Sequence, residues 1–134
     1  MKYLMALCTL ALAFALALNT AEAKTSTLKG YVVDQMCAQK MAAKDNAMEK
    51  AEGHTKACAL NDQCAGSGYG ILSDGKYYKF DEKGSAKAKE MIEKSKREKA
   101  LYFEAKGTVE EGSITVTSLK EMKPPSPKMM KKGT

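Results

Sequence analysis

The residues of this chain that could bind a metal ion or do redox chemistry gather in one short stretch. Cys37, Cys58, Cys64 and His54, the only histidine, lie within 28 consecutive residues of the 134-residue chain. His54 and Cys58 are four residues apart, so on a helix an imidazole and a thiolate would lie one turn apart and reach the same cation. Three thiolates and one imidazole form a Cys₃His set, which suits zinc as a structural ion. The spacing therefore predicts a metal site made by these four side chains.

Two kinds of neighbouring residue bear on such a site. Asp34 precedes Cys37 by three residues. From there its carboxylate either hydrogen-bonds His54 behind the metal or caps the helix that follows. Met36 and Met41 supply thioether sulfur nearby, and thioether together with thiolate also suits copper(I). Zinc and copper(I) are both candidate ions, with Met36 and Met41 as candidate soft donors.

The odd number of cysteines outside the N-terminal segment leaves two other interpretations open. Three thiols in an oxidising compartment can also hold one disulfide beside a free thiol, or an intermolecular bridge. A disulfide between Cys58 and Cys64, or between Cys37 and either of them, would make the protein a stapled binding or interaction domain. A free cysteine would suit thiol redox chemistry. We expect a binding protein rather than an enzyme, because the C-x-x-C and C-x-x-C-H motifs of thiol oxidoreductases and of haem attachment are absent.

The first 23 residues have the pattern of a cleaved secretory signal. Lys2 precedes an apolar run over 4–18 that is too short for a transmembrane helix, and Ala21-Glu22-Ala23 is an A-x-A cleavage site. Cleavage after Ala23 would remove Cys8 and leave a periplasmic or secreted protein. We expect its partner to be an envelope protein or a small ligand, and we expect no nucleic-acid partner because the protein is exported.

Patterns of apolar residues around the cysteine stretch predict five strands and two helices. Good helix formers over 36–52, with Gly53 as a stop, predict one helix, and amphipathic spacing over 81–99 predicts another. Asp74-Gly75 predicts a tight hairpin turn, and Gly107 predicts a bulge inside a strand. The predicted strands cover 28–34, 69–72, 76–80, 101–109 and 113–119.

This order of elements predicts a mainly β fold. We expect an OB-like five-stranded β-barrel, with a helical Cys/His insertion after the first strand and one helix between the third and fourth. An open α+β sandwich of the same strands is the alternative. The chain is short enough for a single domain, which we place at 24–122 with the insertion at 36–65. Residues 123–134 are expected to form a disordered basic tail.

The positive charge is concentrated near the C-terminus. The chain has 22 Lys plus Arg against 16 Asp plus Glu, a net charge of +6. From Lys120 onward there are five Lys and one Glu, which gives +4. We expect this segment to make weak contact with anionic envelope surfaces.

Four short motifs together resemble a group of small exported bacterial proteins that have no established activity. The resemblance covers the chain from about Lys29 to Leu119, and it implies that the Cys and His motifs belong to one site or staple. In the usual form of that group three residues separate the second and third cysteines, whereas five separate Cys58 from Cys64 here. The matching motifs are G-x-V-V-D-x-x-C at 30–37, H-x₃-C-A at 54–59, C-x₃-G-Y-G-I-L at 64–72 and D-G-K-Y-Y-K-F-D at 74–81.

Overall fold

A computed structural model describes residues 24–126 of the protein. The predicted signal peptide at 1–23, and the part of the predicted tail at 127–134, lie outside the described residues. The described chain contains five strands, β1 (Thr25–Asp34), β2 (Tyr69–Ser73), β3 (Lys76–Phe80), β4 (Tyr102–Glu110) and β5 (Ser113–Glu121).

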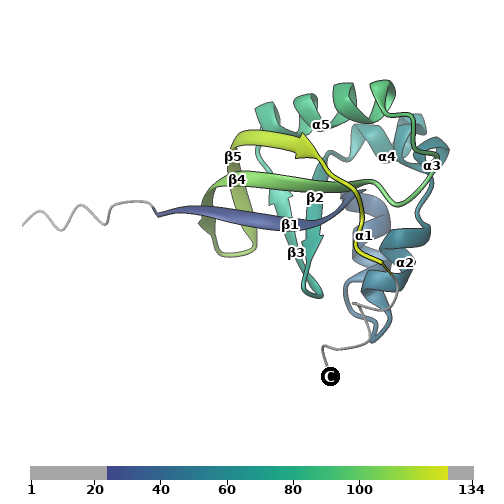
Figure 1. The fold of residues 1–134 in the computed structure, drawn as a ribbon, viewed down its shortest axis with the longest axis horizontal. Helices are drawn as coiled ribbons and strands as arrows, with labels where there is room; N and C mark the ends of the chain where they lie inside the picture. The colour runs from purple at the N-terminus through teal and green to yellow at the C-terminus, as the bar shows by residue number, and fades with distance from the viewer. Residues whose placement is uncertain (1–23, 127–134) are drawn as a thin grey trace, which may run out of the picture.

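The five strands pair in the order β1-β2-β3-β5-β4 and form a closed barrel. The ring closes because β1 pairs with β2 along one edge and with β4 along the other, both antiparallel. β3 and β5 form the parallel pair of the ring. Figure 1 shows the strands curving around one another with a long helix above them. The predicted mainly β fold of five strands is confirmed.

Glycine shapes one hairpin turn and one strand bulge, as the sequence predicts. In the β2–β3 hairpin, Asp74 and Gly75 both have positive φ, 50° and 80°, which matches a tight turn between antiparallel strands. The β4–β5 register shifts between Lys106 and Gly107, so the predicted bulge is confirmed. A Cβ at Gly107 would lie 1.9 Å from the Thr115 carbonyl oxygen. The bulge therefore needs glycine there because the two backbones approach too closely for a side chain.

Five helices complete the described chain. Four short ones lie between β1 and β2, and the fifth lies between β3 and β4 as predicted. In Figure 1 the four short helices gather at one end of the barrel, while the fifth crosses over it. The helices are α1 (Gln35–Met41), α2 (Ala47–Gly53), α3 (Lys56–Leu60), α4 (Asp62–Gly66) and α5 (Glu82–Lys94).

The prediction of one continuous helix over 36–52 is wrong, because α1 and α2 are separate. Between them the amide of Lys44 donates to the Met41 carbonyl and the amide of Ala47 donates to the Lys44 carbonyl, which makes tight turns. Asp45 and Asn46 follow in this break, and both residue types favour turns over helix interiors. The break changes the direction of the chain, so that the alanines of α2 pack on the barrel and Ala47 and Ala51 are both buried.

Two apolar cores share the first strand. Val32 belongs to the core inside the barrel, whereas its neighbours Tyr31 and Val33 belong to a second core between the barrel and α1 and α2. This alternation is the two-residue period of a strand that is buried on both faces. β1 therefore carries the helical insertion as a second layer on its outward face. It ends at Asp34, where α1 begins. In the described residues, no helix is long and apolar enough to span a membrane.

Candidate metal centre

Each of the three cysteines is the third residue of a short helix. α1, α3 and α4 begin two residues before Cys37, Cys58 and Cys64, respectively. Each cysteine therefore follows its helix's N-cap residue by three positions, and in every case the cap side chain accepts a hydrogen bond from the first turn. The three N-cap residues are Asp34, Thr55 and Asn61.

Side-chain hydrogen bonds, two of them from these caps, hold the backbone of the cysteines themselves. Asp34 Oδ2 accepts a hydrogen bond from the Cys37 amide at 2.8 Å, and Thr55 Oγ1 accepts one from the Cys58 amide at 3.1 Å. In α4 the Ser67 hydroxyl donates to the Cys64 carbonyl at 2.6 Å. The same hydroxyl accepts a hydrogen bond from the amide of Met36 at 3.2 Å, which ties α4 to α1.

The helix that carries Cys58 is also anchored to the rest of the fold. The Tyr69 hydroxyl, on β2, donates to the Ala59 carbonyl at 2.6 Å in a buried hydrogen bond. The Lys56 ammonium donates to the carbonyls of Glu93 and Ser95, at 3.0 and 2.8 Å, where α5 ends. α3 is therefore fixed between the barrel and the C-terminal end of α5.

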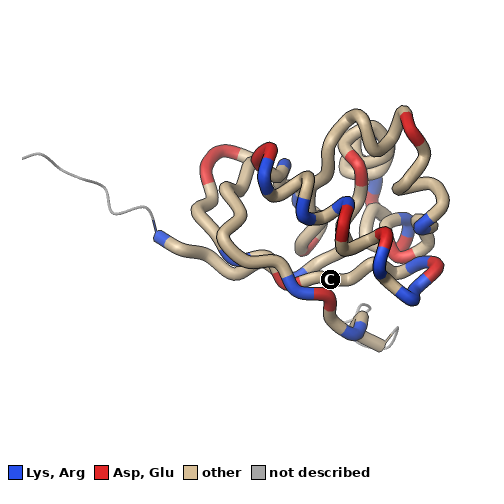
Figure 2. The backbone as a smooth tube through the Cα atoms, turned by 90° about the horizontal axis from the view of Figure 1, so that it is seen from above, with Lys and Arg blue, Asp and Glu red and all other residues tan. Residues whose placement is uncertain are grey.

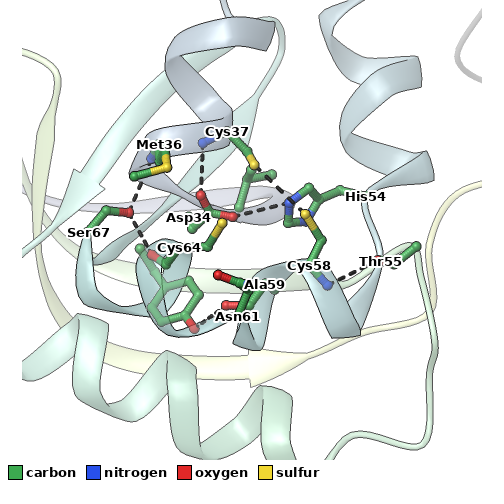
Figure 3. Close-up of polar contacts among 12 residues, drawn as sticks. Asp34, Met36, Cys37, His54, Thr55, Cys58, Ala59, Asn61, Cys64 and Ser67 are labelled. Carbon is green, nitrogen blue, oxygen red and sulfur yellow. Dashed lines mark hydrogen bonds and ion pairs between the residues drawn. The ribbon is translucent and has the colours of Figure 1, made fainter.

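The three thiols converge at one place, as Figure 3 shows. The sulfur atoms of Cys37, Cys58 and Cys64 all lie within 4.8 Å of one another, and all three cysteines are free. Cys37 Sγ and Cys58 Sγ are 4.0 Å apart. Two thiolates bound to one tetrahedral zinc at about 2.3 Å would be separated by about 3.8 Å. The observed spacing is therefore close to that of a shared cation and about twice the length of a disulfide bond.

A buried histidine and a buried carboxylate adjoin this triad. His54 is 6% exposed and Asp34 is fully buried. His54 Nε2 lies 3.1 Å from Asp34 Oδ1 (Figure 3), and Asp34, Cys37 and His54 form a second group of candidate ligands. The Asp34–His54 contact lacks hydrogen-bond alignment, and in the described chain neither ring nitrogen of His54 has a hydrogen-bond partner. Buried polar atoms without partners are rare, and a cation is one of the partners that satisfies them.

Burial and charge keep two of the thiols protonated while no cation is bound. Burial raises the pKa of the Cys37 thiol, and the neighbouring Asp34 carboxylate raises it further. The same two causes raise the pKa of Cys64. Burial would also raise the pKa of Asp34, but its contacts with His54 and the Cys37 amide outweigh burial and lower that pKa. Cys37 and Cys64 therefore lack the low thiol pKa of reactive cysteines.

The structure places most of the predicted site residues together, but not by the predicted geometry. His54 is the C-cap of α2, and Thr55 then caps α3, so His54 and Cys58 do not share a helical face as predicted. The reason is that the Thr55 cap starts a new helix immediately after His54. Asp34 caps α1 through Oδ2, which is one of the two roles that the sequence left open, and its Oδ1 lies 3.1 Å from His54 Nε2.

The methionines are dispersed around the site. Met36 is 38% exposed, and the sulfur of Met48 accepts a hydrogen bond from the Gly75 amide at 3.4 Å, in the β2–β3 turn. Met41 lines a pocket together with His54 and Cys58. Met41 is therefore the predicted soft donor that shares a pocket with two of the candidate ligands.

Sequence reasoning missed the residues that position the thiols. Thr55, Asn61 and Ser67 were not singled out, although a capping residue type three positions before each cysteine was visible in the sequence. Comparison of the chain with protein-family models, with curated proteins and with solved structures finds no match. Function must therefore be inferred from the chemistry of the site itself.

Proposed function

We propose that the protein is a non-enzymatic metal-binding protein that holds one zinc ion through Cys37, Cys58, Cys64 and His54. The observation that carries the proposal is the convergence of three free thiols, from three separately capped helices, beside a buried imidazole without a hydrogen-bond partner. Soft thiolates with one imidazole favour zinc or copper(I) over hard cations such as magnesium. The imidazole and the tetrahedral count of four favour zinc over copper(I).

The contacts of His54 suggest how the four ligands divide their roles. Nε2 faces Asp34 and Nδ1 has no hydrogen-bond partner in the described chain, so we assign Nδ1 to the ion. A carboxylate behind a metal-bound imidazole fixes the orientation of its ring and strengthens it as a ligand. Asp34 is therefore a supporting residue, and binding of the cation would deprotonate the three thiols.

The ion would stabilise the fold more than it would catalyse a reaction. The insertion is built from helices of five and seven residues, which are too short to be stable alone. A four-ligand site joins α1, α3 and α4 to one another and to the end of α2. Such closed sites are typical of structural zinc.

We also propose that the barrel is OB-like and that the protein is exported. The ring order, the parallel β3–β5 pair and the position of α5 support the OB-like assignment. Export would place the site in the periplasm or outside the cell, with the basic tail able to touch anionic envelope surfaces. Mass spectrometry of the purified protein tests export, because a mature N-terminus at Lys24 is expected.

Metal analysis of the purified protein tests the central proposal. We expect about one zinc per chain by elemental analysis. Replacement of zinc by cobalt(II) should give intense near-ultraviolet absorption from thiolate-to-metal charge transfer. Cys37→Ser, Cys58→Ser and Cys64→Ser should each weaken this band, whereas Ser113→Ala, on the far hairpin, should not. A wild-type protein that binds neither ion under reducing conditions would refute the proposal. A protein that carries copper instead would change the identity of the proposed ion from zinc to copper.

One observation favours a second candidate, a disulfide-stapled interaction domain. The 4.0 Å between Cys37 Sγ and Cys58 Sγ could close to a bond with small side-chain movements. Peptide mapping of the non-reduced protein separates the two candidates. A Cys37–Cys58 peptide without bound metal would support the staple, and three alkylatable thiols after metal removal would support the metal site.

A further inference from the structure

A solvent-facing pocket adjoins the candidate metal centre. It has a volume of about 490 Å³, and its wall includes both His54 and Cys58. Cys58 is the exposed thiol of the triad, whereas Cys64 is buried. The pocket is therefore the side from which a solute could reach a cation bound by these residues.

The wall of this pocket carries positive charge. Lys40 from α1, Lys44 from the turn after it, and Lys50 from α2 all line it. None of its described lining residues is Asp or Glu. In the rest of the described chain, both Lys and Arg and Asp and Glu are spread over the fold, as Figure 2 shows. The pocket is thus a place where one sign of charge gathers.

Two of these lysines lie close enough to repel each other. The positive charge of Lys44 lowers the pKa of Lys50, and burial adds to this effect. In the described chain, no ion pair joins Lys40, Lys44 or Lys50 to a carboxylate. A like-charged group beside a site for a cation would repel the free ion, but it would attract an anion that carries the ion.

We propose that the pocket formed by Lys40, Lys44, Lys50, His54 and Cys58 is the exchange route of the metal centre, and that it receives the ion from small anionic chelators. This inference rests on the proposed function. A carboxylate-rich or thiol-containing chelate that carries net negative charge is the fitting donor. The lysines hold the chelate, and the exposed thiol of Cys58 is the first ligand of the protein to reach its ion.

The exchange step changes ligands without oxidation or reduction. The Cys58 thiol loses its proton to water, and a sulfur lone pair forms the bond to the ion. One donor oxygen of the chelator leaves with the electron pair that it had shared. The remaining protein ligands then replace the other chelator oxygens in the same way, and the released chelator keeps its charge.

Stopped-flow transfer of cobalt(II) tests this route, with the thiolate charge-transfer band as the readout. The donors are the anionic nitrilotriacetate complex and the cationic complex of tris(2-aminoethyl)amine. The test variant is Lys40→Gln/Lys44→Gln/Lys50→Gln, in the full chain. The matched control removes three exposed lysines from α5, as Lys83→Gln/Lys87→Gln/Lys89→Gln.

The two donors should respond in opposite directions. In the pocket variant, uptake from the anionic donor should slow about tenfold, and uptake from the cationic donor should become faster. Added salt should reduce both differences. The α5 control should follow the wild type with both donors. A folding defect cannot produce the opposite pair of changes.

Two results would overturn the inference. If the wild type forms the charge-transfer band but the pocket variant takes up cobalt at the wild-type rate from both donors, the exchange route is wrong while the metal centre stands. If the wild type forms no band with either donor or with aquated cobalt(II), the proposed function fails and the exchange route fails with it.

Discussion

Asp34 divides two tasks between its two carboxylate oxygens. Oδ2 caps α1 through the Cys37 amide, and Oδ1 faces Nε2 of the buried His54. The carboxyl is fully buried, yet these contacts hold its pKa below the ordinary value, so it stays ionised. One residue therefore sets both the backbone position of a thiol and the charge beside the imidazole.

Substitution of Asp34 separates these two tasks. Asn caps helices about as well as Asp, so Asp34→Asn should keep the helix start and lose only the charge behind His54. We expect zinc affinity, measured by chelator competition, to fall about 10-fold to 100-fold. Asp34→Ala should lose the cap as well and lower the unfolding free energy of the metal-free protein by about 1 kcal/mol more than Asp34→Asn. Wild-type zinc affinity in Asp34→Asn would show that the residue is only a cap.

The membership of the site could be predicted from residue types, but its geometry could not. The concentration of one His and three Cys in 28 residues pointed to side chains that the structure brings close together. The spacing of His54 and Cys58 pointed to one helix, because a four-residue interval fits a helical turn. The Thr55 cap instead starts a new helix, and tertiary contacts bring the side chains together.

At the scale of elements, the insertion relies on caps more than on helix length. α3 and α4 have five residues each, and each begins at a side chain that satisfies an amide of its first turn. Single turns of helix are unstable without such partners. The position of each thiol therefore depends on its own cap, in addition to the packing of α1 and α2 on the barrel.

The cap of α3 offers a direct test at this scale. Thr55→Ala removes the acceptor for the Cys58 amide and should lower the unfolding free energy by about 0.5–2 kcal/mol. Zinc binding should weaken by up to about 30-fold at the upper end of that range, because the bound state must restore the same turn. Thr55→Ser keeps the hydroxyl and should restore both quantities toward the wild type. Chemical unfolding and chelator competition measure the two effects, and equal losses in Ala and Ser variants would contradict the role of the cap.

The elements of the barrel agree with the sequence-based predictions better than the elements of the insertion do. The Asp74-Gly75 turn and the Gly107 bulge were predictable because each depends on local backbone geometry. The split of 36–52 into α1 and α2 was not, because most residue types on either side of Asp45 and Asn46 favour helix. Asp45 and Asn46 are a local signal for a turn, but the break also depends on the packing of Ala47 and Ala51 against β1, which residue types alone do not show.

For the whole molecule, the proposed metal centre would join the four short helices of the insertion to one another. α1 and α2 share a smaller core with the outward face of β1, whereas α3 contributes Ala59 to the core of the barrel. A bound ion would stabilise the folded insertion more than the barrel, by the free energy of binding to the folded state. At a free concentration 100 times the dissociation constant, that free energy is about 2.7 kcal/mol.

Removal of the metal should therefore loosen the insertion more than the barrel. In hydrogen exchange, we expect the amides of α3 and α4 to exchange about 100-fold faster after chelation than at that zinc concentration. Amides in the β1–β4 pair should change much less. In Cys58→Ser, chelation should have little effect on any of these amides. Uniform acceleration across barrel and insertion would show that the two layers unfold as one unit.

The parallel β3–β5 pair has a consequence for how the barrel stays shut. These strands pair only at Lys79–Ser113 and Phe80–Ile114 in the described chain, a short ladder beside the long antiparallel ones. Phe80 and Ile114 are both buried there. At this seam, side-chain packing rather than the backbone ladder supplies most of the closure. Breathing motions should begin at the seam, and since α1 and α2 pack on β1 and β2, these two helices should stay in place when the seam opens briefly.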